Sequence, residues 1–208
     1  MNRRGFLVAG AAAAGGSAAA LTWSAAPPAD HGSLSGQTGA AWFTNVALRT
    51  HDGRTVRFYD DLLRGKIVLI NFIFMACGDI CPSMTQNLVS VQERLGSRLG
   101  RDIFMYSISL DPEHDTPEML KAYAEALGVG PGWLFLTGSP ADIELLRHRL
   151  GFVWSDPLRD ADRTQHIGVV RIGNEPLHRW TMCPGLANPA AIVRSVRRVI
   201  PGATWDAA

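Results

Sequence analysis

The segment IVLINFIFMACGDICP, residues 67–82, decides how this chain folds. Its first half, residues 67–74, is an almost continuous apolar run, which is typical of a buried strand in a central sheet. After it the apolar period becomes helical, and Pro82 is tolerated in a first helical turn. The residues at helical spacing are Met84, Leu88, Val91, Leu95 and Leu99. We therefore predict a strand followed by a helix, with Cys77 and Cys81 in the connecting turn.

Strands and helices alternate along the rest of the chain. We expect further strands over residues 43–48, 55–58, 103–110, 133–136, 166–172 and 177–181. We expect further helices after Thr116-Pro117, Ser139-Pro140 and Asn188-Pro189, where a capping residue precedes a proline. Residues 151–165 are polar and irregular. The order predicts an α/β fold: a thioredoxin-like three-layer sandwich with a mixed central sheet and an N-terminal β-hairpin.

Length and composition are consistent with one domain. The chain has 208 residues, of which 47% are hydrophobic, so it can build one sizeable core. Its formal net charge is +1, and no basic stripe runs along it. Nucleic acid is therefore not expected as a partner.

The first 26 residues are interpreted as an export signal. Arg3-Arg4 is followed by Phe6-Leu7, a Gly/Ala-rich apolar stretch and the small-residue exit Ser24-Ala25-Ala26. The paired arginines resemble the twin-arginine type, and the stretch is too weakly hydrophobic to favour a permanent membrane helix. We expect a signal over 1–26, a linker over 27–41 and a domain over 42–203. The protein is then periplasmic or otherwise exported, without a transmembrane anchor once the signal is cleaved.

The cysteine pair offers three kinds of chemistry. Two thiols at this spacing can form a disulfide, exchange one, or hold a soft metal ion. A structural disulfide would stabilise weakly, because only three residues separate Cys77 and Cys81. The partial positive charge at the start of the following helix is expected to lower the pKa of Cys81. The turn is therefore interpreted as an accessible functional site.

A histidine is the usual third partner of two thiolates in a copper site. His166 stands at the start of a predicted strand that neighbours the strand ending at Phe74 in a thioredoxin-like sheet. It can therefore face the cysteine turn, although position alone does not single it out. The other histidines are His31, His51, His114, His148 and His178.

Two motifs resemble the Sco/SenC family of copper-binding assembly proteins. They are FIFMACGDICPS, residues 72–83, and SLDPEHDTP, residues 109–117, and the resemblance covers about residues 43–200. It implies a thioredoxin-like fold, a location outside the cytoplasm, and a copper ion held by Cys77, Cys81 and His166. It further implies a metallochaperone, rather than an enzyme, that delivers copper to a respiratory or other copper enzyme, as in cytochrome c oxidase assembly. Its partners would be that client or another copper chaperone.

The chain departs from the family pattern near the histidine. The family usually has an aspartate directly before its ligand histidine, whereas this chain has Gln165, with Asp162 as the nearest acid. The loop over residues 151–164 is also shorter than usual. Inside the turn, Asp79 resembles the acidic residue of the family, and turn propensity explains it equally well.

Other functions remain as alternatives. A thiol-disulfide oxidoreductase that reduces the cysteines of a partner's copper site would use the same two thiols. Its usual motif, however, has two residues between the cysteines, and no proline precedes the strand at 166–172. A peroxiredoxin-like peroxidase would have Thr where Phe74 stands, and a zinc site would lack a fourth ligand. Met75, Met84 and Cys183 are interpreted as core residues, and the role of Cys183 stays open.

Overall fold

The computed structural model describes residues 39–78, 80–162 and 165–202. The predicted signal over 1–26, residues 27–38 of the predicted linker, and Asp79 lie outside the described residues. Among the helices that are described, each is too short or too polar to cross a lipid bilayer.

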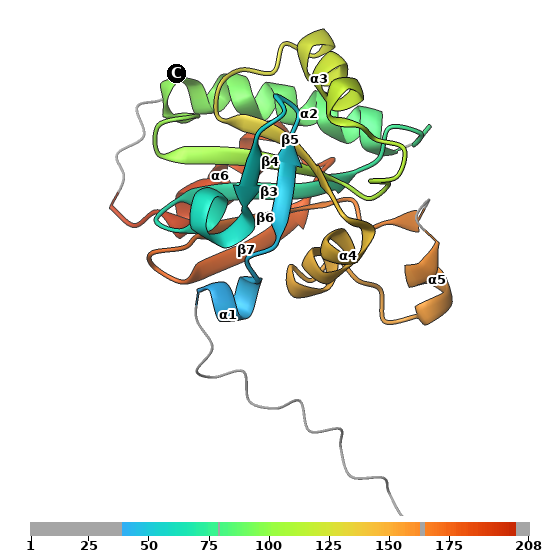
Figure 1. Ribbon diagram of the computed structural model, residues 1–208. Coiled ribbons are helices and arrows are strands. Elements are labelled where there is room, and N and C mark those ends of the chain that lie inside the picture. Colours follow the sequence, from blue (N-terminus) through green and yellow to red (C-terminus); the bar gives the residue numbers. More distant parts are fainter. Residues whose placement is uncertain (1–38, 79, 163–164, 203–208) are drawn as a thin grey trace, which may run out of the picture. The chain divides into compact units, whose positions relative to one another are not determined.

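The described strands form one seven-stranded mixed sheet in the order β2-β1-β5-β4-β3-β6-β7 (Figure 1). The strands are β1 (Ala47–Thr50), β2 (Thr55–Arg57), β3 (Ile67–Ile73), β4 (Ile103–Ser109), β5 (Trp133–Gly138), β6 (Val169–Asn174) and β7 (Arg179–Pro184). β3 runs parallel to β4 and antiparallel to β6, and β1 and β2 form the N-terminal hairpin. The predicted thioredoxin-like α/β fold with a mixed sheet is confirmed.

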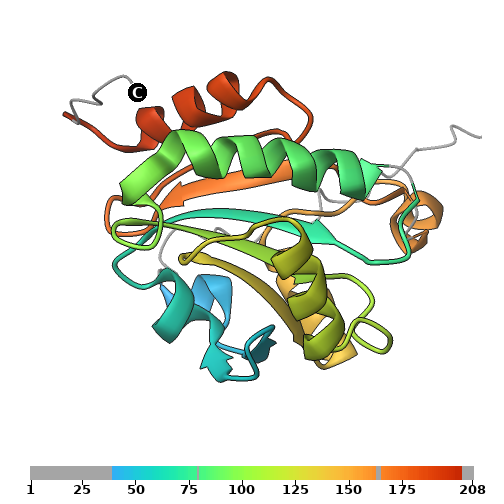
Figure 2. The same ribbon diagram turned by 90° about the horizontal axis from the view of Figure 1, so that it is seen from above.

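Helices cover both faces of this sheet. They are α1 (Ala40–Phe43), η1 (Phe58–Leu63), α2 (Ile80–Leu95), η2 (Gly96–Arg98), α3 (Pro117–Ala126), α4 (Pro140–Arg149), α5 (Pro157–Ala161) and α6 (Pro189–Val199). Buried residues of α2, α3 and α6 share one core with one face of the sheet, and those of α1, η1 and α4 share a second core with the other face. Figure 2 shows α2 and α6 side by side over the sheet. The three layers follow from these two cores.

β3 is buried because its side chains supply both cores. Successive side chains of a strand point to opposite faces. Leu69 and Ile73 accordingly enter the core under α2, while Val68, Ile70 and Phe72 enter the core on the other side. Each of these side chains is at most 1% exposed. This explains why the run at 67–74 is apolar at nearly every position.

Two predicted boundaries near the N-terminus of the domain were wrong. Phe43, predicted to begin a strand, ends the short helix α1, and its ring packs on Trp180 with 4.6 Å between the ring centroids. Phe58, predicted to end a strand, begins the π-helical turn η1 instead. Both rings are buried in the core that α4 covers. Long-range packing therefore overrides the local strand pattern.

Three differences concern the segments that build the site. α2 begins at Ile80, so Cys81 lies inside its first turn and Pro82 follows it there. Residues 151–165, predicted as irregular, contain the short helix α5, which Asp156 caps through the amide of Leu158. β6 begins at Val169, so His166 lies in the loop before the strand and not at its start.

Candidate metal centre

Both cysteines lie at the carboxyl end of β3, where the chain enters α2. The amide of Cys77 donates to the carbonyl of Phe74 at 3.2 Å, which closes a tight turn after the strand. Cys81 lies in the first turn of α2, and its carbonyl accepts a hydrogen bond from Thr85 Oγ1 at 2.8 Å. Cys77 is 8% exposed and Cys81 is 3% exposed, so both thiols are buried, whereas Ala76 and Gly78 of the turn are exposed. Apolar residues of β3 and α2 surround the thiols.

His166 lies beside Cys81. The distance from His166 Nε2 to Cys81 Sγ is 3.4 Å. The imidazole also meets the ring of Phe74 edge-on, with 5.8 Å between the ring centroids. The antiparallel pairing of β6 with β3 explains this approach, because Arg171 opposite Ile70 directs earlier residues of the chain toward the end of β3. The prediction that His166 faces the cysteine turn agrees with this geometry.

The thiol of Cys81 interacts with that of Cys77 and is protonated at neutral pH. The pKa of Cys81 is raised to about 12, mainly by burial. A backbone hydrogen bond at Phe74 opposes this shift, while the hydrogen bond and charge of Cys77 and the charge of Asp115 add to it. The prediction that the helix start lowers this pKa was therefore wrong. Removal of water from the thiolate outweighs the helix dipole here. A metal ion has to displace the thiol protons to bind.

A cavity of about 40 Å³ adjoins the thiols. Its walls are formed by Ile73, Phe74, Met75, Cys77, Cys81, Pro82 and Tyr123. That volume suits a single ion or water molecule rather than an organic ligand. Tyr123 of α3 brings a half-buried phenol to this cavity.

The donor set fits copper. Two sulfur donors and one imidazole nitrogen are ligands that copper prefers, whereas a structural zinc site needs a fourth protein ligand. Met84 is 0% exposed and packs in the core, as predicted. Cys183 lies on β7 and interacts with Ser195 of α6, and burial raises its pKa. Cys183 therefore belongs to the packing between β7 and α6.

The other described histidines make contacts elsewhere. His51 Nδ1 accepts from the amide of Phe135 at 3.1 Å. His114 Nδ1 pairs with Asp111 at 2.8 Å, and His148 Nε2 pairs with Glu144 at 3.0 Å. His178 follows β6 with a φ of 50°. His31 lies outside the described residues.

Two hydrogen bonds hold Gln165, one made by its side chain and one by its backbone carbonyl. Its side-chain amide donates to Asp162 at 2.9 Å, and its carbonyl accepts from Trp154 Nε1 at 2.6 Å. The residue that replaces the family's aspartate thus binds the nearest acid, and it connects His166 to the segment before α5. The sequence alone indicated neither contact.

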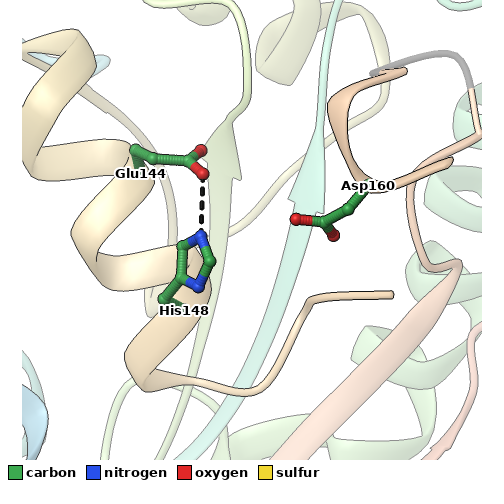
Figure 3. Close-up of side chains that lie close together, drawn as sticks. All are labelled: Glu144, His148 and Asp160. Atoms are coloured by element: carbon green, nitrogen blue, oxygen red, sulfur yellow. Dashed lines mark hydrogen bonds and ion pairs between the residues drawn. The ribbon is translucent and has the colours of Figure 1, made fainter. Parts of the chain in front are cut away.

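A second group of potential ligands, Glu144, His148 and Asp160, lies between α4 and α5 (Figure 3). The Arg147 guanidinium donates to Glu144 and to Asp160, each at 2.7 Å from Nη2. Both carboxylates are thus already paired with one guanidinium, whose side chain is only 11% exposed. The group is an ion-pair network that fastens α5 to α4. We assign no metal to it.

This network lines a larger cavity that reaches His166. The cavity has a volume of about 320 Å³, and its lining includes Arg147, Asp160, Trp154 and His166. The amide of Trp154 donates to Asp160 at 2.6 Å, so the network also holds the loop between α4 and α5. The ion pairs therefore help to hold α5 and the loop before it beside the cavity that His166 lines.

We predict that Asp160→Asn lowers stability in a pH-dependent way. The hydrogen bonds from Arg147 and from the amide of Trp154 lower the pKa of Asp160 to about 2. A lowered pKa stabilises the fold above the unfolded value of about 4, and this contribution is lost as pH falls toward 2. The variant should be less stable by about 2 kcal/mol at pH 7, and the difference should shrink as pH falls and disappear only below about pH 2. Urea unfolding across this pH range measures it, and a constant difference between the two proteins would contradict it.

The fold and the site together define a class of protein: a thioredoxin-like dithiol protein whose Cys-x-x-x-Cys turn faces a histidine. The chain belongs to the SCO1/SenC family, whose model matches residues 37–201.

Individual relatives agree with this assignment. The chain is 37% identical over 98 residues to the SCO1 protein homolog of Bacillus subtilis (strain 168), a match that covers 46% of this chain and 49% of the relative. It thus spans about half the length of the curated relatives it matches.

Solved structures are similar over more of the chain. One is BsSco, a member of the Sco family of cytochrome c oxidase assembly proteins in which a disulfide switch has been identified. It is 26% identical, with a TM-score of 0.61 and coverage of 76% of this chain and 92% of its own. Bradyrhizobium japonicum ScoI with copper bound shares the fold, with 24% identity, a TM-score of 0.60 and coverage of 79% and 100%.

Proposed function

We propose that this protein is a copper metallochaperone that works outside the cytoplasm. It holds one copper ion between the thiolates of Cys77 and Cys81 and the imidazole of His166, and passes it to a copper enzyme of the cytochrome c oxidase type. The 3.4 Å approach of His166 Nε2 to Cys81 Sγ carries this proposal. The copper-bound Sco relative supports the identity of the metal.

The location follows from the sequence. The paired Arg3-Arg4 and the apolar stretch after them are the basis for export by a twin-arginine-type signal. In such a compartment a dithiol is not kept reduced by default. Copper capping would then compete with oxidation of the same two thiols.

Transfer needs a site that a partner can enter. The thiols are buried, but His166 is half-buried and lies in the wall of the larger cavity. We infer that an accepting protein approaches from the His166 side and exchanges its own ligands for this histidine first. The imidazole is also the neutral member of the donor set, so its departure separates less charge than that of a thiolate.

Copper titration of the reduced protein tests the proposal. One equivalent should bind, and the loaded protein should pass the ion to a copper-free acceptor domain of a copper enzyme. A stoichiometry well below one, or an ion that never leaves, would refute the chaperone role. Copper content before and after separation of the two proteins gives both quantities.

The second candidate is a thiol-disulfide oxidoreductase, which the hydrogen bond between the two thiols favours. In that reaction Cys77 and Cys81 lose two electrons and two protons and form a disulfide, and the partner disulfide gains both as two thiols. Replacement of His166 should leave this exchange active but weaken copper binding. Loss of either cysteine should abolish both. Parallel assays on the same variants separate the two functions.

A further inference from the structure

Asp115 is a buried acid beside the candidate site that the proposed ligand set does not use. It lies in the loop between β4 and α3 and is 2% exposed. Burial raises its pKa, and the hydrogen bonds that it accepts lower it. A carboxylate removed from water is costly unless donors surround it. The position therefore calls for a reason beyond loop geometry.

Two donors converge on this carboxylate. Ser109 Oγ, at the end of β4, donates to Oδ2 at 2.6 Å. The amide of Met75 donates to the same carboxylate, at 3.2 Å from Oδ2 and 3.4 Å from Oδ1. In both contacts the neighbouring group donates and the carboxylate accepts, which suits the ionised form of the acid.

These contacts join the ends of the two central strands. Ile73 and Ser109 are partners in the parallel ladder, and the amide of Leu110 donates to the carbonyl of Ile73 at 2.7 Å. The backbone hydrogen bonds between β3 and β4 end at these residues. Past this point the amide of Met75 donates to the side chain of Asp115 instead of to a backbone carbonyl of β4. Met75 lies two residues before Cys77. The carboxylate is thus the point at which the cysteine turn is fastened to β4.

The charge of Asp115 also reaches the metal ligands. The carboxylate holds the amide of Met75, and Met75 lines the same small cavity as Cys77 and Cys81, so the negative charge lies close to the ligand thiols. Two thiolates and a neutral imidazole cancel the charge of Cu(II), but they leave a net charge of about −1 with Cu(I). A neighbouring carboxylate repels the second complex more than the first.

We propose that Asp115 is a positioning residue of the copper site with two roles. Its carboxylate anchors the Met75 amide, so that Cys77 stays beside Cys81. Its negative charge favours binding of Cu(II) over binding of Cu(I). This inference rests on the proposed function for its copper part only. The anchoring part concerns the copper-free protein and stands separately.

Asp115→Asn removes the charge and keeps the shape of the side chain. In the copper-free reduced protein, hydrogen exchange of the Met75 amide should become about tenfold faster, because a neutral amide oxygen accepts this hydrogen bond more weakly than a carboxylate does. The ratio of the Cu(I) to the Cu(II) dissociation constant should fall about tenfold in favour of Cu(I). Competition titrations with a chelator of each ion measure the ratio, and residue-resolved exchange measures the amide.

Ser109→Ala separates the two roles. It removes one of the hydrogen bonds that hold the carboxylate but leaves the charge, so the Met75 amide should exchange a few times faster while the copper ratio stays within about twofold. Asp111→Asn is the matched control. It removes an acid from the same loop that pairs with the exposed His114, and it should change neither quantity by more than about twofold.

Each outcome decides one part of the proposal. Unchanged Met75 exchange in Asp115→Asn overturns the anchoring role, and an unchanged copper ratio overturns the charge role. If Asp115→Asn does not fold, two other variants decide. Unchanged Met75 exchange in Ser109→Ala then overturns the anchoring role. For the charge role to stand, Asp115→Glu, which keeps the charge, must fold and retain the copper ratio of the parent. If the parent binds no copper, the proposed function fails and takes the charge role with it, whereas the exchange data still decide the anchor.

Discussion

Replacing His166 by alanine is expected to lower copper affinity by about a hundredfold or more while the fold stays intact. The imidazole Nε2 lies 3.4 Å from Cys81 Sγ, so the variant removes the nitrogen donor that lies beside the thiols. Two thiolates remain, and two ligands hold copper less tightly than three. Competition against a chelator of known affinity measures the loss, and circular dichroism checks the fold.

The cysteine variants should have larger effects. Cys77→Ala and Cys81→Ala each remove a charged sulfur donor, and we expect each to reduce affinity by more than His166→Ala does. Two matched controls lie elsewhere in the domain. Cys183→Ala removes the thiol that packs against α6, and His148→Ala removes an exposed imidazole on α4. Both should bind copper like the parent.

These variants also indicate where the site assignment would fail. Unchanged affinity in His166→Ala would remove this residue from the ligand set. A loss in His148→Ala of similar size would move the metal to the group between α4 and α5. The absence of any effect of Cys81→Ala would exclude copper binding at the turn altogether.

Leu88→Ala is expected to destabilise the domain by about 2–5 kcal/mol. Leu88 lies on α2, the helix that begins with the cysteine turn, and is 1% exposed in the core beneath it. Its removal leaves a cavity between α2 and the sheet, since densely packed neighbours relax only partly. The free energy of unfolding of a typical domain is about 5–15 kcal/mol, so this loss is a large fraction of it.

Leu158→Ala is the control with identical chemistry. Leu158 lies on α5 and is 86% exposed, so its replacement should change stability by less than about 0.5 kcal/mol. Urea unfolding of the reduced, copper-free proteins, followed by tryptophan fluorescence, compares the two variants. Equal losses would contradict the packing of α2 against the sheet.

The sequence predicted the elements whose pattern is local. The apolar run at 67–74 became the central strand β3, because a strand that serves two cores must be apolar on both faces. The proline-capped helices α3, α4 and α6 begin where Thr116, Ser139 and Asn188 cap them. Residues 151–165 failed as a prediction, although Asp156-Pro157 carries the same cap-and-proline signal as the other helices. The contacts of Asp160 with Arg147 and Trp154, which hold α5 in place, are not visible in any local pattern.

For the site, the sequence by itself determined which donor atoms are available: two thiols on a strand-to-helix turn, and a histidine at a position that the family resemblance singled out. Tertiary structure decided their environment. It buried Cys81 and so raised its pKa, where the start of α2 alone suggested the opposite shift. It also brought Asp115 to the Met75 amide. The physical reason is that desolvation and long-range hydrogen bonds depend on which segments pack together, whereas residue spacing records only one segment at a time.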